Sequence, residues 1–452
     1  MRCPRPCARR CARRCLARCP PTVRAVRNEG VNPRPAFRAH TSIPIAWRSN
    51  VSHPHHQVLI IGGGTAGLTV AARLRRKGVR GVAIIEPSAH HYYQPLWTLV
   101  GGGAADIAST VRPEADYIPK GTHWIQDRAE DVDPVRQEVR TRGGLSLGYD
   151  FLVVAPGIQL DWDKVPGLRE ALETPYVSSN YAFHLATKTW EMVRAFKGGT
   201  ALFTHPATPV KCAGAPQKIM YLVADHLRRS GLAERSHVVF GSAGKAIFGV
   251  KPFADVLEGV VRRYGIDTRF GHNLVEVRPE QREALFAVTR DGREERVAIG
   301  YDMLHVTPPQ SAPDFIKRSP LAHQHGPNAG WVKAHKHTLQ HPDHPNVFAL
   351  GDASDLPTSR TGAAIRAEAP VLVENLIAVM EGRTPTARYD GYASCPLVTG
   401  YGKMLLAEFD YDGKPAPSLP LINTLVERRD MWMLKKYGLP RMYWDLMLRG
   451  RA

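Results

Sequence analysis

The stretch Val58-Leu59-Ile60-Ile61-Gly62-Gly63-Gly64-Thr65-Ala66-Gly67 decides the fold of this chain. An apolar strand runs into glycines in the Gly-x-Gly-x-x-Gly spacing, and a helix is expected from there to Arg76. Such glycines permit a tight turn and let a dinucleotide diphosphate approach the backbone at the helix N-terminus. A second apolar strand, 82–85, ends at Glu86, where a carboxylate is well placed to bind a ribose hydroxyl. The stretch therefore predicts a dinucleotide-binding domain of the Rossmann type.

The composition around this stretch is that of an ordinary globular protein. The chain has 452 residues, of which 43% are hydrophobic and 23% charged, so it is long enough for two or three domains with separate cores. The stretch 54–72 contains no charged residue and matches a membrane span in length, but it is interrupted by the glycines of the turn. We therefore expect no transmembrane helix.

The N-terminal segment has a different composition from the rest. Residues 1–50 contain twelve arginines, no lysine and a single acid, Glu29, and so carry +11 of the formal net charge of +18. An Arg-rich leader poor in acids is typical of a mitochondrial presequence, so residues 1–52 are expected to be a targeting leader. The remaining chain carries only +7, which gives no support for nucleic-acid binding.

The seven cysteines fall into two groups. Five lie in the leader, at positions 3, 7, 11, 15 and 19, without the Cys-x-x-Cys pairs that zinc prefers, so no metal site is expected. The body contains only Cys212 and Cys395, which excludes a secreted scaffold held together by several disulfides.

Two later strands indicate which dinucleotide binds. The run 149–157 is a buried-strand pattern that closes with Ala155-Pro156-Gly157, and the run 346–352 closes with Gly351-Asp352. Both resemble elements of flavoproteins with two dinucleotide domains, in which the Gly-Asp carboxylate binds the ribitol of the flavin. The alternative is two core strands followed by turns. The order of the segments, Gly-rich turn first and Gly-Asp last, favours FAD over NAD.

These patterns predict an α/β protein with two doubly wound Rossmann-like domains and a C-terminal amphipathic helical region. The expected boundaries are 53–165 and 321–390 for the FAD-binding domain, 166–320 for the second domain and 391–452 for the C-terminal region. The second domain is degenerate, because no Gly-x-Gly-x-x-Gly follows its first strand, 200–204, and Gly241-Ser242-Ala243-Gly244 lacks the third glycine. A nicotinamide site is therefore poorly supported.

Cys212 stands where the second domain is expected to turn from strand to helix. Lys211 precedes it and Lys218 lies in the first turns of the helix, and both ammonium groups and a helix N-terminus lower the pKa of a thiol. A buried structural cysteine is the alternative. Cys395 is expected in another turn. With two body cysteines on separate turns of a flavoprotein, we favour the hypothesis that they form a redox pair at the flavin face. His205 lies nearby in sequence, but we assign it no catalytic role.

Several motifs resemble the mitochondrial type of sulfide:quinone oxidoreductase. They are the runs 208–221 around Cys212 and 394–401 around Cys395, together with 93–98, 246–251 and 303–309. The resemblance covers about residues 55–450. It implies that FAD is the cofactor and that Cys212 and Cys395 form the redox pair, bridged by a disulfide or an extra sulfur. Hydrogen sulfide is then the substrate, ubiquinone the electron acceptor, and sulfite, glutathione or cyanide the small sulfur acceptor.

The same resemblance implies an FAD site and a peripheral location on the mitochondrial inner membrane. Several positions depart from the pattern: Pro156 lies inside the Ala-x-Gly turn, Glu368 stands where related quinone-reducing flavoproteins usually have Gln, and Pro370 follows it inside a predicted helix. The implied cofactor contacts include the glycine turn, a carboxylate at each end of the cofactor and a helix start, namely Gly62, Gly64, Thr65, Ala66, Gly67, Glu86, Gln94, the backbone of Ala129, Lys218, Asp352 and Gly362.

The C-terminal region leaves two interpretations open. Trp, Tyr and Met alternate with Lys and Arg in 431–437 and 442–449, which favours an interfacial helix in the membrane headgroups beside a quinone channel. The alternative is a helix pair packed on the protein's own core or on the partner in a homodimer. Two rival functions also remain: an NADH:quinone dehydrogenase on the same fold, and a non-catalytic FAD-binding redox sensor.

Overall fold

The computed structural model describes residues 54–419 and 421–452 of the chain. The expected targeting leader, 1–52, and its five cysteines lie outside the described residues. Among the described residues, no helix is both long and apolar enough to cross a membrane.

The first domain is built on a seven-stranded sheet that begins with the glycine-turn strand. Strands β5, β2, β1 and β8 run parallel, β19 pairs with β8, and β7 and β6 add an antiparallel edge. Their bounds are β1 His55–Ile61, β2 Val82–Ile85, β5 His123–Ile125, β6 Ala129–Asp133, β7 Glu138–Thr141, β8 Ser146–Val154 and β19 Val347–Ala349. The late strand β19 therefore returns to the first sheet, as the Gly-Asp motif predicts.

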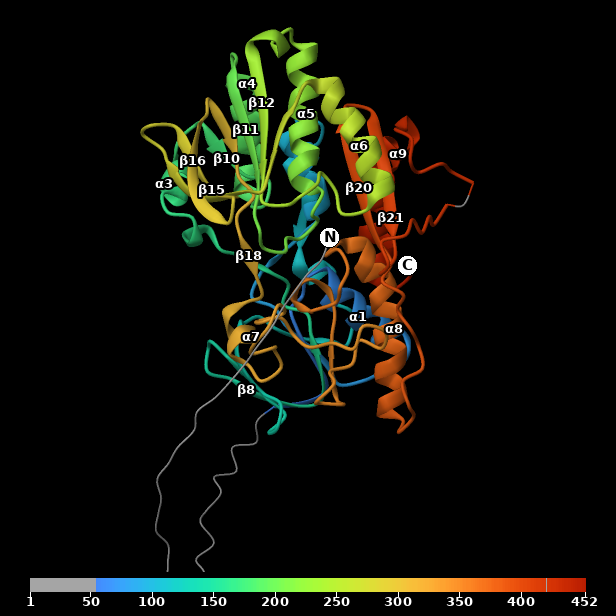
Figure 1. The fold of residues 1–452 in the computed structure, drawn as a ribbon. Coiled ribbons are helices and arrows are strands. Elements are labelled where there is room, and N and C mark those ends of the chain that lie inside the picture. The colour runs from blue at the N-terminus through green and yellow to red at the C-terminus, as the bar shows by residue number, and fades with distance from the viewer. Residues whose placement is uncertain (1–53, 420) are drawn as a thin grey trace, which may run out of the picture. The chain divides into compact units, whose positions relative to one another are not determined.

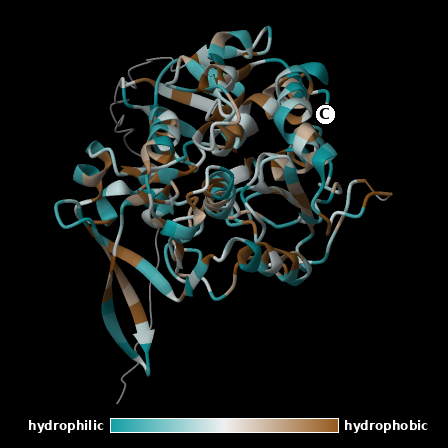
Figure 2. Cartoon of the chain, turned by 90° about the horizontal axis from the view of Figure 1, so that it is seen from above, coloured by the Kyte–Doolittle hydropathy of each residue, from teal (hydrophilic) through white to brown (hydrophobic). Residues whose placement is uncertain are grey.

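Two helices carry most of the first domain's helical core. They are α1, Thr65–Arg76, and α8, Gly362–Met380, which lie side by side in Figure 1 and share one hydrophobic cluster. In Figure 2 the helices show both brown and teal, as expected for elements with one buried and one exposed face. Short elements complete the domain: β3 His90–Tyr92, β4 Val111–Pro113, α2 Trp97–Gly101 and α7 Asp314–Arg318.

The second domain has a five-stranded parallel sheet in the order β10-β17-β11-β12-β13. A three-stranded antiparallel sheet, β14 to β16, lies beside it, and the short pair β9 and β18 joins the two domains. The strands are β9 Gln159–Leu160, β10 Val177–Ser178, β11 Gly199–His205, β12 Ser236–Ser242, β13 Asp267–Phe270, β14 His272–Arg278, β15 Glu283–Arg290, β16 Arg293–Gly300, β17 Met303–His305 and β18 Gln310–Ser311. The helices are α3 Leu168–Glu173, α4 Phe183–Ala195, α5 Ala215–Arg229 and α6 Lys251–Tyr264. Two Rossmann-like domains are thus confirmed, while their expected boundaries stay a prediction.

The C-terminal region starts with a β-hairpin rather than a turn at Cys395. Strands β20, Ala393–Gly400, and β21, Lys403–Phe409, pair antiparallel and pack on α5 and α6 (Figure 1). The prediction of a turn at Cys395 is wrong, because Cys395 lies within β20 of this two-stranded hairpin. Its Pro396 lacks an N–H, which a two-stranded ribbon tolerates without losing a central ladder bond.

The chain ends in a helical segment of short pieces. These are α9 Arg429–Met433, α10 Leu439–Arg441, π-helical turns at 434–438 and 442–446, and a 3-10 turn at 447–449. Trp432, Tyr443 and Trp444 are buried in the core of the first domain, whereas Met433, Tyr437 and Leu446 are exposed. The three aromatic residues therefore agree with the second interpretation, in which this region packs on the protein's own core. The three exposed residues are free to contact a membrane or a partner protein.

Candidate active site

A cleft of about 360 Å³ lies between the two domains and the C-terminal helical segment. Both cysteine-bearing segments reach it. Its lining comes from the β1–α1 turn, the segment after β8, the β11–α5 turn, the start of α8, strand β20 and the C-terminal helix. Of the predicted cofactor contacts, it includes Gly62, Gly64, Thr65, Ala66, Glu86, Gln94, Lys218, Asp352 and Gly362.

The β1–α1 turn has the geometry that a diphosphate requires. Gly62 has φ +98°, and a Cβ there would lie 2.3 Å from the carbonyl oxygen of Ala155. A Cβ at Gly67 would lie 1.8 Å from the oxygen of Gly62, so Gly67 shapes the turn without lining the cleft. At Gly64 nothing approaches within 4 Å, which leaves its backbone open to a ligand. These residues fit the diphosphate of FAD.

Carboxylates lie on both sides of this turn. Glu86 accepts a 2.8 Å hydrogen bond from the N–H of Gly63, which fixes its side chain beside the turn. Asp352 lines the cleft after β19, and burial raises the pKa of its carboxyl while Lys211 and Arg360 oppose that rise. Ala129, by contrast, lies in β6 and is not part of the lining, so its backbone contact with the cofactor stays a prediction.

Cys212 and Cys395 meet at the second-domain side of the cleft, with 3.7 Å between their sulfurs. Cys212 has φ +51°, a left-handed conformation that is costly for a residue with a side chain. Its N–H donates to the carbonyl of Arg360 over 2.8 Å, which helps to hold this conformation. Cys395 is 1% exposed and projects from β20. A Cβ at Gly214 would lie 2.5 Å from its sulfur, so a glycine is needed there.

The two thiols differ in protonation. A hydrogen bond with Cys395 and the nearby Lys218 ammonium hold the pKa of Cys212 well below its usual range, although burial opposes them. The same hydrogen bond, together with burial, raises the pKa of Cys395. The Nζ of Lys218 lies 3.0 Å from the Cys212 sulfur. These surroundings therefore favour the thiolate at Cys212 and the thiol at Cys395.

Lys211 does not contact Cys212, contrary to the prediction that it favours the thiolate. Its Nζ donates instead to the Oε1 of Gln94 over 2.5 Å and lies over the rings of Trp97 and Tyr181. Burial lowers the pKa of Lys211 to about 8. His205 ends β11, is not part of the cleft lining, and has a pKa lowered by burial to about 4. Lys218 alone therefore holds the thiolate directly.

Lys435 is a cleft residue that the sequence analysis missed. It comes from the C-terminal helix, is 2% exposed and donates to the carbonyl of Pro95 over 3.1 Å. Burial, with the repulsion of Lys218 added, lowers the pKa of Lys435 to about 7. A lysine in a stretch of alternating basic and aromatic residues is expected at the surface, so the sequence carries no signal for its burial.

Comparisons with known proteins decide the family. A family model described as pyridine nucleotide-disulphide oxidoreductase matches residues 56–198. The mitochondrial sulfide:quinone oxidoreductase of Mus musculus is 47% identical over 397 residues, which cover 88% of this chain and 87% of the mouse protein. This chain belongs to the mitochondrial sulfide:quinone oxidoreductase family. The namesake protein of Schizosaccharomyces pombe is 36% identical over 421 residues, covering 88% of this chain and 90% of its own.

Membership in the sulfide:quinone oxidoreductase family makes the chain an FAD-dependent oxidoreductase. The solved sulfide:quinone oxidoreductase of Aquifex aeolicus shares its fold, with a TM-score of 0.70 and 18% identity, covering 88% of this chain and 92% of that one. The prediction of two Rossmann-like domains with FAD as cofactor is therefore confirmed.

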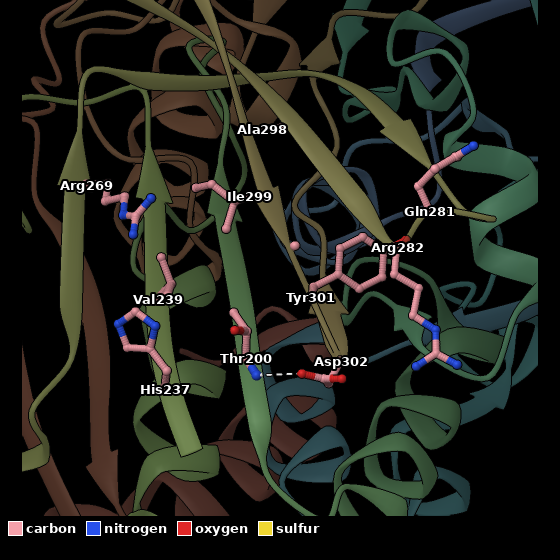
Figure 3. Close-up of a pocket in the computed structure, with 11 residues that line it drawn as sticks. Thr200, His237, Val239, Arg269, Gln281, Arg282, Ala298, Ile299, Tyr301 and Asp302 are labelled. Carbon is pink, nitrogen blue, oxygen red and sulfur yellow. Dashed lines mark hydrogen bonds between the residues drawn. The ribbon is translucent and has the colours of Figure 1, made fainter. Parts of the chain in front are cut away.

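A second, wider hollow of about 610 Å³ lies at the opposite end of the second sheet (Figure 3). Thr200 and His237 near the starts of β11 and β12 line it, whereas Cys212 follows the end of β11. The carboxylate of Asp302 accepts from the N–H of Thr200, and Arg269 pairs with Asp267. Because this hollow lies at the end of the sheet away from Cys212, it takes no part in the cysteine site.

Proposed function

We propose that this chain oxidises hydrogen sulfide at the Cys212 and Cys395 pair and transfers two electrons to ubiquinone. The carrying observation is a pair of cysteines whose sulfurs lie 3.7 Å apart, Cys395 buried and Cys212 partly buried, with a lysine 3.0 Å from the Cys212 sulfur, in the cleft that contains the dinucleotide turn. The names of the mouse and yeast relatives support sulfide as substrate, quinone as acceptor and the mitochondrion as location.

The oxidised pair is the form that reacts. A direct S–S bond is about 2.05 Å long, and one extra sulfur between the two cysteines spans at most about 4.1 Å. A separation of 3.7 Å therefore suits either a short closure to a disulfide or a single bridging sulfur. For the disulfide, hydrosulfide attacks Cys395, the S–S bond breaks, and Cys395 persulfide and Cys212 thiolate result. In the bridging form, the same attack breaks the bond between Cys395 and the bridging sulfur, so Cys395 persulfide forms and Cys212 leaves as a persulfide anion that retains the bridging sulfur.

The asymmetry of the two thiols sets the direction of this attack. A leaving thiol departs faster when its pKa is low, and Cys212 has the lowered pKa of the pair. Lys218 stabilises the negative charge that Cys212 acquires. Lys435, close enough to affect both cysteines, adds a second positive charge when protonated and so favours the entry of an anionic hydrosulfide.

The cycle closes with sulfur transfer. A small nucleophile such as sulfite or glutathione takes the outer sulfur of the Cys395 persulfide, which leaves two cysteine thiolates. Cys212 and Cys395 would then re-form their bond and release two electrons, and FAD held in the cleft would supply the two-electron redox chemistry between this pair and ubiquinone. The N-terminus of α8 supplies positive potential here, because Gly362 lines the cleft and Thr361 caps the helix by accepting from the N–H of Ala364.

The C-terminal helical segment is the proposed contact with the mitochondrial inner membrane. Leu439 and Met442 line the cleft, while Met433, Tyr437 and Leu446 are exposed on the same short segment. An apolar quinone would approach the cleft along this segment. A homodimer partner that covers the same residues is the alternative occupant, and flotation of the protein with anionic vesicles distinguishes it from the membrane.

The testing experiment is an anaerobic visible spectrum of the holoprotein, titrated with sulfide and then with a short-chain ubiquinone. We expect sulfide to bleach the flavin and to produce a long-wavelength thiolate band, both reversed by quinone. Cys395→Ser retains FAD but loses the response to sulfide. A flavin that NADH bleaches and sulfide does not would establish the NADH:quinone dehydrogenase alternative, and indifference to both donors would leave the redox-sensor alternative.

A further inference from the structure

Glu368, in the middle of α8, is a buried carboxyl group that the proposed chemistry does not use. Its side chain is 2% exposed, and its Oε2 accepts a 2.9 Å hydrogen bond from the backbone N–H of Gly351. The nearby cation is Arg360, whose guanidinium donates to the carbonyls of Asp352 and Ser354 and stacks over Trp331. Arg360 is therefore bonded to the loop after β19, and no cation within 54–419 or 421–452 forms an ion pair with Glu368.

Opposing effects act on the pKa of the Glu368 carboxyl. Burial and the negative charge of Asp352 raise the pKa of Glu368 to about 7. The Gly351 N–H, Arg360 and Tyr389 act in the opposite direction and limit this rise. From the C-terminal side, Tyr389 and Tyr411 face the carboxyl with neutral hydroxyl groups. A carboxyl group in these surroundings changes its protonation in response to a small change in local charge.

Glu368 lies directly behind residues that line the cleft. Gly351 and Asp352 line the cleft, and so does Ile365, which lies one turn before Glu368 on α8. A Cβ at Gly351 would lie 2.8 Å from the Cδ1 of Ile365, so the turn packs directly on the helix. Charge that appears in the cleft therefore acts on Glu368 through buried protein, where Coulomb interactions are several times stronger than in water.

We propose that the Glu368 carboxylate takes up one proton from water when two electrons enter the cleft at FAD, and returns it to water when they leave. The step forms and breaks one O–H bond, and the electrons are those of the flavin's own redox cycle. Glu368 acts through the Gly351–Asp352 turn and touches no reacting atom, so it is a positioning residue. Uptake of the proton compensates the negative charge of the reduced cofactor.

Infrared difference spectroscopy tests this directly. The FAD-loaded full chain is reduced with dithionite, and the reduced-minus-oxidised spectrum is recorded in H₂O and in D₂O. We expect a protonated-carboxyl band to appear on reduction, to shift in D₂O and to be absent in Glu368→Gln. The matched control is Glu374→Gln, which alters an exposed carboxylate on the same helix and keeps the band. A band that persists in Glu368→Gln, or none in the wild type, overturns the proposal.

A second measurement covers the case in which Glu368→Gln loses FAD or fails to fold. Glu368→Asp retains a carboxyl group in a slightly different environment and is expected to show the band at a changed frequency. An unchanged band there contradicts the assignment. In addition, the midpoint potential of the flavin is expected to depend more steeply on pH in the wild type than in Glu368→Gln near pH 7.

The inference rests on FAD in the cleft and not on sulfide as the donor. Dithionite supplies the electrons in both measurements, so the result is independent of the cysteine chemistry. A protein that shows the Glu368 band but does not respond to sulfide would refute the proposed function and leave this inference standing.

Discussion

The β1–α1 turn and the β11–α5 turn occupy the same place in their two Rossmann-like domains, yet they serve different chemistry. In the first turn, Gly62 and Gly67 remove side chains so that a diphosphate can approach the helix N-terminus. In the second turn, Cys212 occupies a left-handed conformation that a glycine would adopt more easily. The start of α5 then faces a thiolate instead of a phosphate. Under the proposed function, one fold would thus support a cofactor site and a redox site through a few different residues at one topological position.

The largest expected effect comes from Gly62→Ala in the first turn. Its Cβ would lie 2.3 Å from the backbone of Ala155, and the residue would be strained at φ +98°, so the turn must move. We expect the variant to lose FAD, measured as the flavin-to-protein absorbance ratio after gel filtration. Gly249→Ala is the control, because nothing lies within 4 Å of its Cβ position. Full FAD retention in Gly62→Ala contradicts the role of this turn.

Cys212→Ser in the second turn separates the two functions. FAD stays bound because the glycine turn is intact, whereas sulfide-dependent quinone reduction falls at least ~1000-fold, the effect of removing one member of an essential catalytic pair. Steady-state rates and the flavin absorbance are measured on the same sample. Activity within a factor of two of wild type would refute the cysteine mechanism.

Gly214→Ala tests how closely the second turn is fitted to Cys395. The added Cβ would lie 2.5 Å from the Cys395 sulfur and the same distance from Leu397, so it displaces one sulfur from the other. We expect an activity loss of about 100-fold, since a displacement of this kind disrupts a near-attack geometry. Thiol counting under native conditions measures whether the pair still closes. A pair that closes normally would show that the glycine is dispensable.

Lys218→Met has the smallest effect and concerns the charge of the second turn. Lys218 lowers the pKa of Cys212, so its removal raises that pKa and decreases the thiolate fraction at neutral pH. The pH midpoint of the thiolate-to-flavin band is expected to move upward by about one unit, with activity near pH 7 about tenfold lower. Lys251→Met, an exposed lysine paired with Asp255, serves as control. A downward shift would contradict the assignment.

Local sequence patterns were sufficient to predict those features of the site that depend on one short segment. The glycine spacing after 58–61 predicted the first turn. The basic residues around Cys212 predicted a lowered thiol pKa, which results from the hydrogen bond with Cys395 and from the charge of Lys218. Prediction failed where a contact joins distant segments. Cys395 was expected in a turn, but it belongs to β20, whose partner β21 and support α5 are not visible in its own sequence.

The sequence by itself determined the α/β class, the FAD turn and the identity of the two cysteines, because periodicity, glycine spacing and residue chemistry are local properties. Only the tertiary structure decided that Lys435 is a buried cleft residue, that Lys211 contacts Gln94 instead of Cys212, and that Glu368 lies behind the Gly351 turn. The physical reason is burial. The charge of a lysine or a carboxyl depends on how much water and which charges the whole fold places around it, and no local pattern encodes that.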